Sequence, residues 1–342
     1  MSKIYFNFWD FKIKLDCESE KICDLLKKDF HYFLSEESAV NLEIKAIITK
    51  EINHLIPSDL IASKQNSRAM TFQDGSLRYN YFYGKAVSIL DYAKSYIEVY
   101  SQTEEYLHEL LYLVILSRQT KYHDLNGLHK VHAFGISKFG VNLVGMMDSK
   151  GGKTTLFSYF LDQEGVEIIS DDSPMIDLRG NIKAFPIRIG YELNSYSRER
   201  LQAYEEKSYH FDRDEYDAKK LIDILEFKNK ISENSAKNKT ILFQGKRINS
   251  KDNCHYKKIS KYKMWRYLMK NMVVGVGLPM VLEYYLESSF SDKFKNLKIL
   301  ISRAISAMRL LVKSDCYEVY LSFSPDENFK KLNELLELYK NE

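Results

Sequence analysis

A short glycine-bearing segment holds the residues of this chain that are best suited to chemistry. Residues 147–155 read Met-Asp-Ser-Lys-Gly-Gly-Lys-Thr-Thr, and Gly152-Lys153-Thr154 fits the second half of the phosphate-binding template G-x-x-x-x-G-K-[ST]. Glycines let backbone N–H groups turn toward phosphate oxygens, because no Cβ obstructs them. A helix that begins here directs the positive end of its dipole at the same anion. The segment therefore predicts a nucleoside-triphosphate site.

Each polar residue of this segment has an expected role. Lys153 would pair with the charge of the β- and γ-phosphates, and the Thr154 hydroxyl would hold magnesium. Met147 stands where the template has its first glycine, so it either tolerates the turn or weakens nucleotide binding. The alternative for the whole segment is a chance helix N-terminus after a buried strand. The expected nucleotide-binding residues are Asp148, Ser149, Lys150, Gly151, Gly152, Lys153, Thr154 and Thr155.

Two adjacent acids follow the next apolar run. Asp171 and Asp172 come directly after Val166–Ser170, behind the helix that the glycine-bearing loop begins. A carboxylate at this place can reach the magnesium ion of a bound nucleotide. Two acids offer two functions, one at the metal and one that accepts a proton from an attacking hydroxyl. The alternative is a turn or a helix cap, because Asp-Asp-Ser-Pro is also good turn chemistry.

The elements around these residues predict an α/β fold. Gly140–Met146 is a nearly unbroken apolar strand, a helix follows from Thr154 to Asp162, and Val166–Ser170 is the next strand. This order of strand, loop, helix and strand is the start of an α/β nucleotide-binding core. We expect a small N-terminal α/β region over residues 1–122 and a nucleotide-binding domain over residues 123–342.

The remaining elements are predicted from hydrophobic periodicity and turn residues. In the N-terminal region we expect a strand at Ile4–Leu15, a helix at Ser19–Leu34, a strand at Asn41–Thr49, a hairpin at Arg68–Tyr83, a strand at Tyr96–Tyr100 and a helix at Thr103–Arg118. Further along we expect strands at Val131–Ser137, Ile182–Ile189, Thr240–Phe243 and Cys316–Phe323, and helices at Ile259–Met272, Pro279–Leu286 and Glu327–Tyr339.

Several of these segments together resemble a known family, the catalytic domain of HPr kinase/phosphorylase. They are more similar still to the HPr-kinase-like serine kinases of peptide natural-product clusters. The resemblance covers roughly His129–Gly190 and implies a P-loop core of the HPr kinase and phosphoenolpyruvate carboxykinase type. The segments that carry it are His132-Ala133, Val141–Gly145, residues 148–156, residues 168–172 and Phe185-Pro186.

The resemblance implies an ATP-dependent kinase that uses ATP, or another nucleoside triphosphate, with Mg²⁺. The phosphate acceptor would be a hydroxyl, that of a serine in a precursor peptide or protein. Asp171 would be the general base and Asp172 a metal contact beside Thr154, although the two acids could exchange roles. Lys153 and His132 would lie at the phosphates; the alternative for His132 is an ordinary histidine on a strand. The family's tendency to oligomerise leaves a homo-oligomer open.

The chain also departs from the bifunctional members of that family. The first glycine of the loop is missing, and no segment matches the later signature that accompanies phosphorylase activity. A kinase with another substrate is therefore expected. Three alternatives stay open: a kinase of a small hydroxy compound such as free serine, a catalytically inactive nucleotide-binding regulatory module, and a nucleic-acid-dependent ATPase.

Basic residues outside the loop allow more than one interpretation. Arg188 could contact phosphate through its forked guanidinium, or it could be a solvated surface arginine. The stretch Lys246–Lys270 interleaves basic and aromatic residues. It could be a helix with Ile259, Tyr262, Trp265, Leu268 and Met269 facing the core, a contact for peptide or nucleotide, or, least favoured, a nucleic-acid surface.

Composition places the chain among ordinary globular proteins. Of its 342 residues, 45% are hydrophobic and 28% are charged, and the net charge of +3 argues neither for nor against nucleic acid. The four cysteines form no C-x-x-C pair, so we expect reduced thiols in a cytoplasmic protein. We expect no signal peptide and no membrane partner, because no apolar run is long enough to cross a bilayer.

Overall fold

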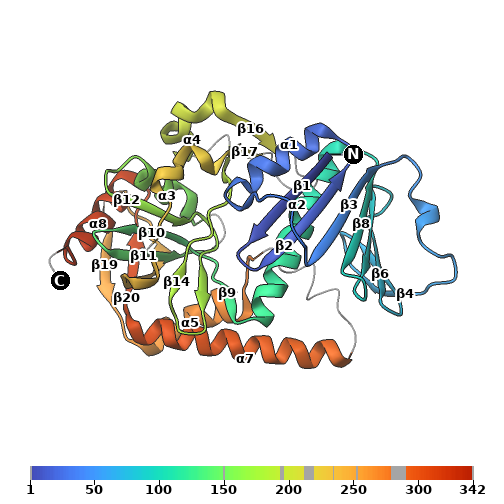
Figure 1. The fold of residues 1–342 in the computed structure, drawn as a ribbon. Coiled ribbons are helices and arrows are strands. Elements are labelled where there is room, and N and C mark those ends of the chain that lie inside the picture. The colour runs from blue at the N-terminus through green and yellow to red at the C-terminus, as the bar shows by residue number, and fades with distance from the viewer. Residues whose placement is uncertain are drawn as a thin grey trace. The chain divides into compact units, whose positions relative to one another are not determined.

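Helices and strands mix throughout the chain, as the sequence predicts (Figure 1). The computed structural model describes residues 2–148, 151–192, 196–211, 219–233, 235–251, 253–278 and 290–340. The expected helix Pro279–Leu286 and the loop residues Ser149 and Lys150 lie outside these ranges. The chain divides into two units: residues 2–122 with 209–211, 219 and 290–293 form the first, and the other described residues from His123 onward form the second.

The first unit is built on an eight-stranded sheet with the order β1-β2-β3-β8-β7-β6-β5-β4. Helix α1 (Glu20–Asp29) packs against β1 and β2, and its first turn is capped by Ser19, whose hydroxyl accepts a hydrogen bond from Ile22 N. Helix α2 (Glu104–Leu125) belongs to this unit up to Tyr122. The strands are β1 (Ser2–Phe8), β2 (Phe11–Cys17), β3 (Leu42–Ile48), β4 (Ala62–Gln65), β5 (Met70–Asp74), β6 (Leu77–Tyr81), β7 (Ala86–Asp91) and β8 (Tyr96–Ser101).

One expectation for this unit is wrong. Ile4–Leu15 is not a single strand but the hairpin of β1 and β2, which turns at Trp9 and Asp10. Trp9 takes a positive φ of 58° without a glycine to mark the turn. Phe8 and Phe11 on its two sides are both buried, so the apolar pattern continues across the turn and hides it from sequence inspection.

The second unit is built on a six-stranded sheet with the order β12-β10-β11-β18-β20-β19. Its strands β11, β18 and β20 run parallel, so their carboxyl ends share one edge of the sheet. A small sheet, β14-β13-β9, lies in the same unit. The strands of the two sheets are β9 (Leu128–Lys130), β10 (Phe134–Lys138), β11 (Val141–Met146), β12 (Val166–Ser170), β13 (Met175–Asp177), β14 (Ile182–Lys183), β18 (Lys239–Arg247), β19 (His255–Lys258) and β20 (Ser314–Leu321).

Side chains of the six-stranded sheet alternate between two apolar cores. Leu143 faces one core together with residues of helices α3 (Lys153–Leu161) and α8 (Pro325–Glu337). Its neighbour Val144 faces the other core, which contains residues of α5 (Lys261–Leu268) and α7 (Phe290–Lys313). Because successive strand residues point to opposite faces, the sheet is covered on both sides (Figure 1).

The remaining elements are short. They are β15 (Ile189–Glu192), α4 (Tyr196–Leu201), β16 (Ser208–Phe211), β17 (Lys219–Ile222), the π-helical turn Met269–Val274 and the 3₁₀ turns His31–Phe33, Asn53–Leu55, Gln202–Lys207, Ile224–Lys230 and Ser235–Lys237. No helix in the described ranges is both long and apolar enough to cross a bilayer.

Two strands expected in the second unit have different bounds. Ile182–Ile189 is divided between β14 and β15, because Pro186 in its middle has no N–H to donate to a ladder. Val131–Ser137 is also interrupted: β9 ends at Lys130 and β10 begins at Phe134. Between them His132 N donates to Asn271 O and Ala133 N to Asp172 O, so this backbone bonds to a π-helical turn and to the turn after β12 rather than to a strand.

Candidate functional site

The predicted phosphate loop connects β11 to α3 at the carboxyl edge of the parallel strands. Gly152 is the N-cap of α3 with φ 95° and ψ 21°, and among the residues that the structure describes no side chain caps this helix. Gly151 N donates to Asp148 O over 2.9 Å, which tightens the turn. A left-handed conformation is easily adopted only by glycine. The first-turn N–H groups of α3 are therefore left for an anion, which the helix dipole favours at this end.

Gly245 on β18 leaves room for the side chain of Met147. This side chain is buried in the core beneath α3, where a Cβ on Gly245 would lie only 2.8 Å from Met147 Cγ. The non-glycine residues with positive φ among those described are Trp9, Tyr83, Ser95 and Phe139, so Met147 does not take the left-handed conformation. The missing template glycine thus has a structural counterpart: Met147 fills space that Gly245 leaves open.

Lys153 points from the first turn of α3 toward His132. Its ammonium lies 2.8 Å from His132 Nε2 and 3.3 Å from Met147 O. An ammonium can only donate, so Nε2 accepts and the imidazole proton is on Nδ1. Burial lowers the pKa of His132, and the charges of Lys153 and Lys270 lower it further against the opposing effect of Asp172. His132 is therefore a neutral acceptor for Lys153.

Asp172 completes this group from the end of β12. Its Oδ1 lies 3.5 Å from His132 Nδ1, and its backbone oxygen accepts from Ala133 N over 3.1 Å. Asp172 and its neighbour Asp171 are both half-buried. The structure thus brings together three of the predicted residues, His132, Lys153 and Asp172, from separate parts of the sequence.

Thr154 and Asp172 have the chemistry that magnesium requires. A hydroxyl and a carboxylate are hard oxygen donors, and magnesium at phosphate sites takes few protein ligands beside phosphate oxygens and waters. Thr154 is half-buried at the first turn of α3. No cluster of three or more His, Cys, Asp or Glu side chains suited to a metal occurs in the described parts of the chain. The Thr154 hydroxyl and the Asp172 carboxylate are of the ligand types that magnesium takes beside phosphate oxygens.

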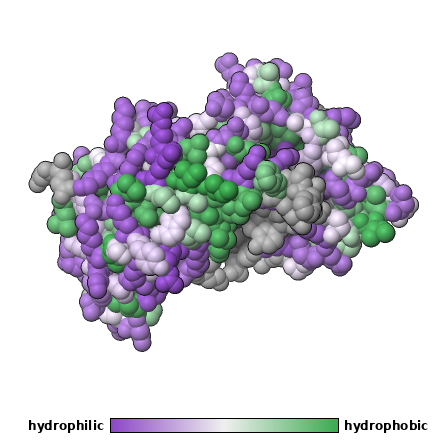
Figure 2. Space-filling model, turned by 90° about the horizontal axis from the view of Figure 1, so that it is seen from below, coloured by the Kyte–Doolittle hydropathy of each residue, from purple (hydrophilic) through white to green (hydrophobic). Residues whose placement is uncertain are grey.

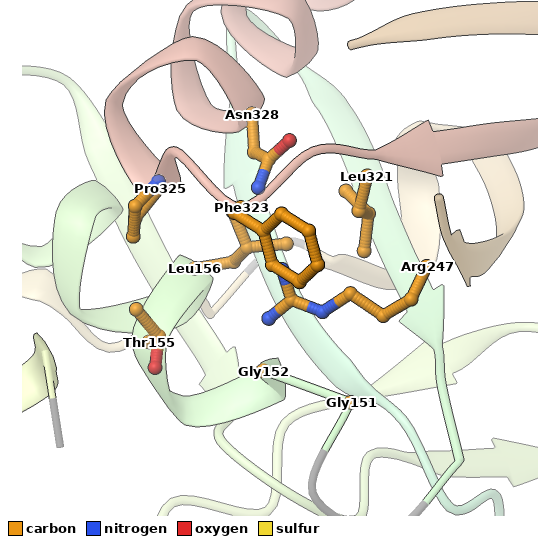
Figure 3. A pocket seen from close by; sticks show the side chains of 9 residues that line it. All are labelled: Gly151, Gly152, Thr155, Leu156, Arg247, Leu321, Phe323, Pro325 and Asn328. Atoms are coloured by element: carbon orange, nitrogen blue, oxygen red, sulfur yellow. The ribbon is translucent and has the colours of Figure 1, made fainter. Parts of the chain in front are cut away.

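A pocket of about 300 Å³ opens beside the loop (Figure 3). Arg247, the last residue of β18, reaches across it toward α3, and a Cβ on Gly152 would lie 2.7 Å from Arg247 Nη2. Arg247 Nη1 donates to Ser322 O over 2.7 Å, and the Asn328 amide is also bonded to Ser322. The lining residues are Gly151, Gly152, Thr155, Leu156, Arg247, Leu321, Phe323, Pro325 and Asn328.

The sequence alone does not predict that Arg247 and Phe323 line this pocket. Arg247 is placed there by its position at the end of β18, and Phe323 by the turn after β20. The available signal is topological: parallel strands end at one edge of a sheet, and ligands bind at that edge. It can be used only once the pairing of β11, β18 and β20 is known.

Four basic residues of the stretch Lys246–Lys270 form ion pairs: Lys246, Lys258, Lys263 and Lys270. The carboxylate of Glu318 lies 2.6 Å from Lys246 Nζ and 2.7 Å from Lys263 Nζ. Burial alone would raise the pKa of Glu318, but hydrogen bonds from these lysines and from Tyr267 lower it to about 2. Lys270 pairs with Asp148 of the loop over 2.6 Å.

The structure contradicts one interpretation of Tyr262, that it faces the core, and one of Arg188, that it is a solvated surface arginine. Tyr262 is 78% exposed and does not face the core, which α5 instead meets through Met264 and Leu268, because Tyr262 lies on the opposite side of the short helix. Arg188 is buried, so it is not a solvated surface arginine. It is also absent from the lining of the pocket.

No protein-family model matches this chain, and a search of curated proteins finds no match. The function must therefore be inferred from the arrangement of His132, Lys153, Asp172 and Arg247 around the loop.

Proposed function

We propose that this protein is a P-loop phosphotransferase of the HPr-kinase-like type. It would transfer the γ-phosphate of ATP, or of another nucleoside triphosphate, to a hydroxyl, with a serine of a peptide or protein as the preferred acceptor. The observation that carries the proposal is the arrangement of Lys153, His132 and Asp172 at the uncapped N-terminus of α3. A helix N-terminus, a lysine and an adjacent carboxylate are the parts that phosphoryl transfer uses.

The charges around the loop support a polyphosphate ligand. Lys153 is the first residue of α3, Arg247 Nη2 would lie 2.7 Å from a Cβ on Gly152, and Lys270 pairs with Asp148 of the loop. Three cations and a helix dipole at one place favour an anion of high charge. Their neighbour Asp172 is the acid that a bound magnesium ion would compensate.

The pocket supports a nucleotide rather than inorganic phosphate. Gly151, Gly152 and Thr155 line it on the loop side, and Leu156, Leu321 and Phe323 supply apolar surface. The Phe323 ring is 54% exposed and is suited to stacking on a planar base. Because the Asn328 amide is already bonded to Ser322, the lining side chains offer little that would distinguish adenine from guanine. ATP and GTP are therefore expected to bind with similar affinity.

The chain's own groups then have the following roles in the transfer step. The acceptor oxygen attacks the γ-phosphorus while the bond from that phosphorus to the β–γ bridging oxygen breaks, and the bridging oxygen keeps the bonding electrons. Asp171 takes the proton of the attacking hydroxyl, and Lys153 compensates the charge that grows on the phosphate oxygens. Thr154 and Asp172 would hold Mg²⁺, which supplies further neutralisation of phosphate charge when it is bound. His132 keeps Lys153 in place before the nucleotide arrives.

The test measures nucleotide binding and phosphate transfer separately. Calorimetry with Mg²⁺ and ATP or GTP is expected to show binding for the wild type and loss of binding for Lys153→Ala. Lys251→Ala, which changes an exposed lysine outside the loop, is the matched control. Mass spectrometry would then detect a phosphate gain on serine peptides or on free serine.

Each outcome of this test has a distinct meaning. Transfer to free serine alone would favour a small-molecule kinase. Binding without transfer to any acceptor would favour a regulatory nucleotide-binding module. Absence of nucleotide binding by the wild type would contradict the proposal.

A further inference from the structure

Helix α7 presents a row of large apolar side chains to solvent. Five residues in one row are each between 40% and 64% exposed: Phe294, Ile301, Ile305, Met308 and Val312. We call these five residues the α7 stripe. Leu297 and Leu300, which are 52% and 41% exposed, widen this apolar surface on one flank of the row. Figure 2 looks at the molecule from below, and apolar residues gather in a continuous patch on this face. Scattered exposed apolar side chains are common, but a patch on one helix calls for a partner.

The spacing of the α7 stripe is that of a helix-pairing seam. From Ile301 to Val312 the steps are four, three and four residues, and Phe294 lies one heptad before Ile301. This 3-4 repeat keeps a narrow seam in line with a second helix. The opposite face of α7 is already fixed in the protein, since Ala307 and Leu310 are buried in the core. The stripe therefore belongs to a folded and anchored helix.

A row of positive charge borders the α7 stripe on one side only. Lys295, Lys298, Arg309 and Lys313 are exposed. At 3.6 residues per turn they fall about 60–120° from Ile301, all in the same direction around the helix. The surface thus combines an apolar seam with a basic border, and no acidic residue lies between Phe294 and Lys313 to neutralise it.

We propose that the α7 stripe docks an amphipathic helix of a partner peptide or protein whose flank is acidic. The seam supplies apolar packing, and the basic row fixes the orientation of the partner by pairing with its acids. This inference is independent of the phosphotransfer proposed above, because it uses no residue of the phosphate site.

A second copy of this chain fits these observations less well. In an antiparallel pair of α7 helices the two basic rows would face each other. In a parallel pair each row would meet the apolar flank of the other copy, so the cations would stay unneutralised in both.

The test uses designed helical peptides as probes. One peptide of about three heptads carries Leu at its a and d positions and Glu at the flanking positions; its matched control carries Lys in place of Glu. Fluorescence anisotropy with the full chain is expected to show binding of the Glu peptide, weakened by added salt. The double variant Ile301→Ser with Ile305→Ser should bind about tenfold more weakly. Ile61→Ser, at an exposed isoleucine of the first unit, should bind as the wild type does.

Charge reversal distinguishes this docking from non-specific hydrophobic binding. Lys295→Glu with Lys298→Glu, both on the exposed row, should shift the preference from the Glu peptide to the Lys peptide. Circular dichroism confirms that each variant is folded. The proposal is overturned if the Glu peptide does not bind, or if the two peptides bind the wild type equally.

Two further results would assign the stripe to another occupant and so overturn the proposal. One is flotation of the protein with phosphatidylserine vesicles without peptide binding. The other is a dimer, seen by light scattering, that the Ile301→Ser and Ile305→Ser substitutions abolish.

Discussion

The ammonium of Lys153 donates a hydrogen bond of 2.8 Å to Nε2 of His132, and so it joins the first turn of α3 to the connection between β9 and β10. The His132 ring packs closely against Gly277, since a Cβ on Gly277 would lie 2.8 Å from the same Nε2 atom. The position of Lys153 before any ligand arrives therefore depends on a glycine more than a hundred residues further along the chain.

Gly277→Ala should disturb this contact. Gly277 has a φ of 90°, so alanine is strained there by about 1–2 kcal/mol, and its Cβ would also push the imidazole away from Lys153. We expect reduced stability in urea and weaker nucleotide binding by calorimetry. Gly165→Ala is the control, because Gly165 has a φ of 69° but nothing within 4 Å of its added Cβ. In a His132→Ala background the steric part of the Gly277→Ala effect should disappear. Equal effects of Gly277→Ala and Gly165→Ala on nucleotide binding would contradict this account.

Lys130→Met should stabilise the protein at neutral pH. Lys130 is buried, and its Nζ has no hydrogen-bond partner in the described parts of the chain. Nζ lies 4.0 Å from the centre of the Phe185 ring, and burial lowers the pKa of Lys130 from 10.5 to about 7. The folded chain binds fewer protons at this site than the unfolded chain between these two values, so wild-type stability should rise with pH from about 7 to 10. An apolar side chain of similar length removes this penalty, with an expected gain of about 1–3 kcal/mol at pH 7.

The measurement is the urea midpoint of wild type and Lys130→Met at several pH values above 7. The two curves should approach each other as pH rises, because the wild-type lysine becomes neutral in both states. Parallel curves would show that Lys130 is not the source of the pH dependence.

Glu318→Gln should weaken the link between β20 and α5. Two lysines and two tyrosines, Lys246, Lys263, Tyr267 and Tyr320, donate to the Glu318 carboxylate. Removing the charge is expected to reduce the free energy of unfolding at pH 7 by about 1–3 kcal/mol. Because the pKa of Glu318 is lowered from 4.5 to about 2, its contribution is complete above pH 4.5 and is lost as pH falls toward 2.

Acid titrations of unfolding test this assignment. Glu318→Gln should lose less stability than the wild type between pH 4.5 and 2. Glu164→Gln, at an exposed glutamate of the same unit, should leave the acid dependence unchanged. If both variants follow the wild type, Glu318 is not an important site of acid denaturation.

The sequence predicts this fold best where the signals are local. Val166–Ser170 is confirmed without change, and the helix after the loop begins one residue earlier than expected, at Lys153. Helix α7 is missed entirely, although its apolar residues repeat with helical spacing. The sequence does carry the signal of an amphipathic helix there, because the basic residues and the apolar residues of α7 occupy different sides of the helix.

The candidate site is likewise predicted from the sequence only where its residues belong to one continuous segment. Lys153, Thr154 and the acidic pair follow from spacing, because a phosphate loop is a continuous segment. Arg247 and Phe323 do not, because their place is set by strand order and by the turn after β20. Met147 is a similar case, since only the packing of Gly245 against it explains how it replaces a glycine.

Restoring that template glycine should harm the protein rather than improve the loop. Met147 is 1% exposed and belongs to the core beneath α3, so Met147→Gly creates a cavity and adds backbone freedom. We expect a loss of about 2–5 kcal/mol in the free energy of unfolding and no tighter nucleotide binding. Met147→Leu, which nearly conserves volume, should lose less than about 1.5 kcal/mol and is the control.

Gly245→Ala should also destabilise the wild type, because its Cβ would meet Met147 Cγ at 2.8 Å. The same substitution should be better tolerated beside Met147→Ala, where that contact is gone. Urea unfolding and calorimetry decide the matter: a Met147→Gly variant as stable as the wild type, with tighter nucleotide binding, would mean that the loop needs a glycine at this position after all.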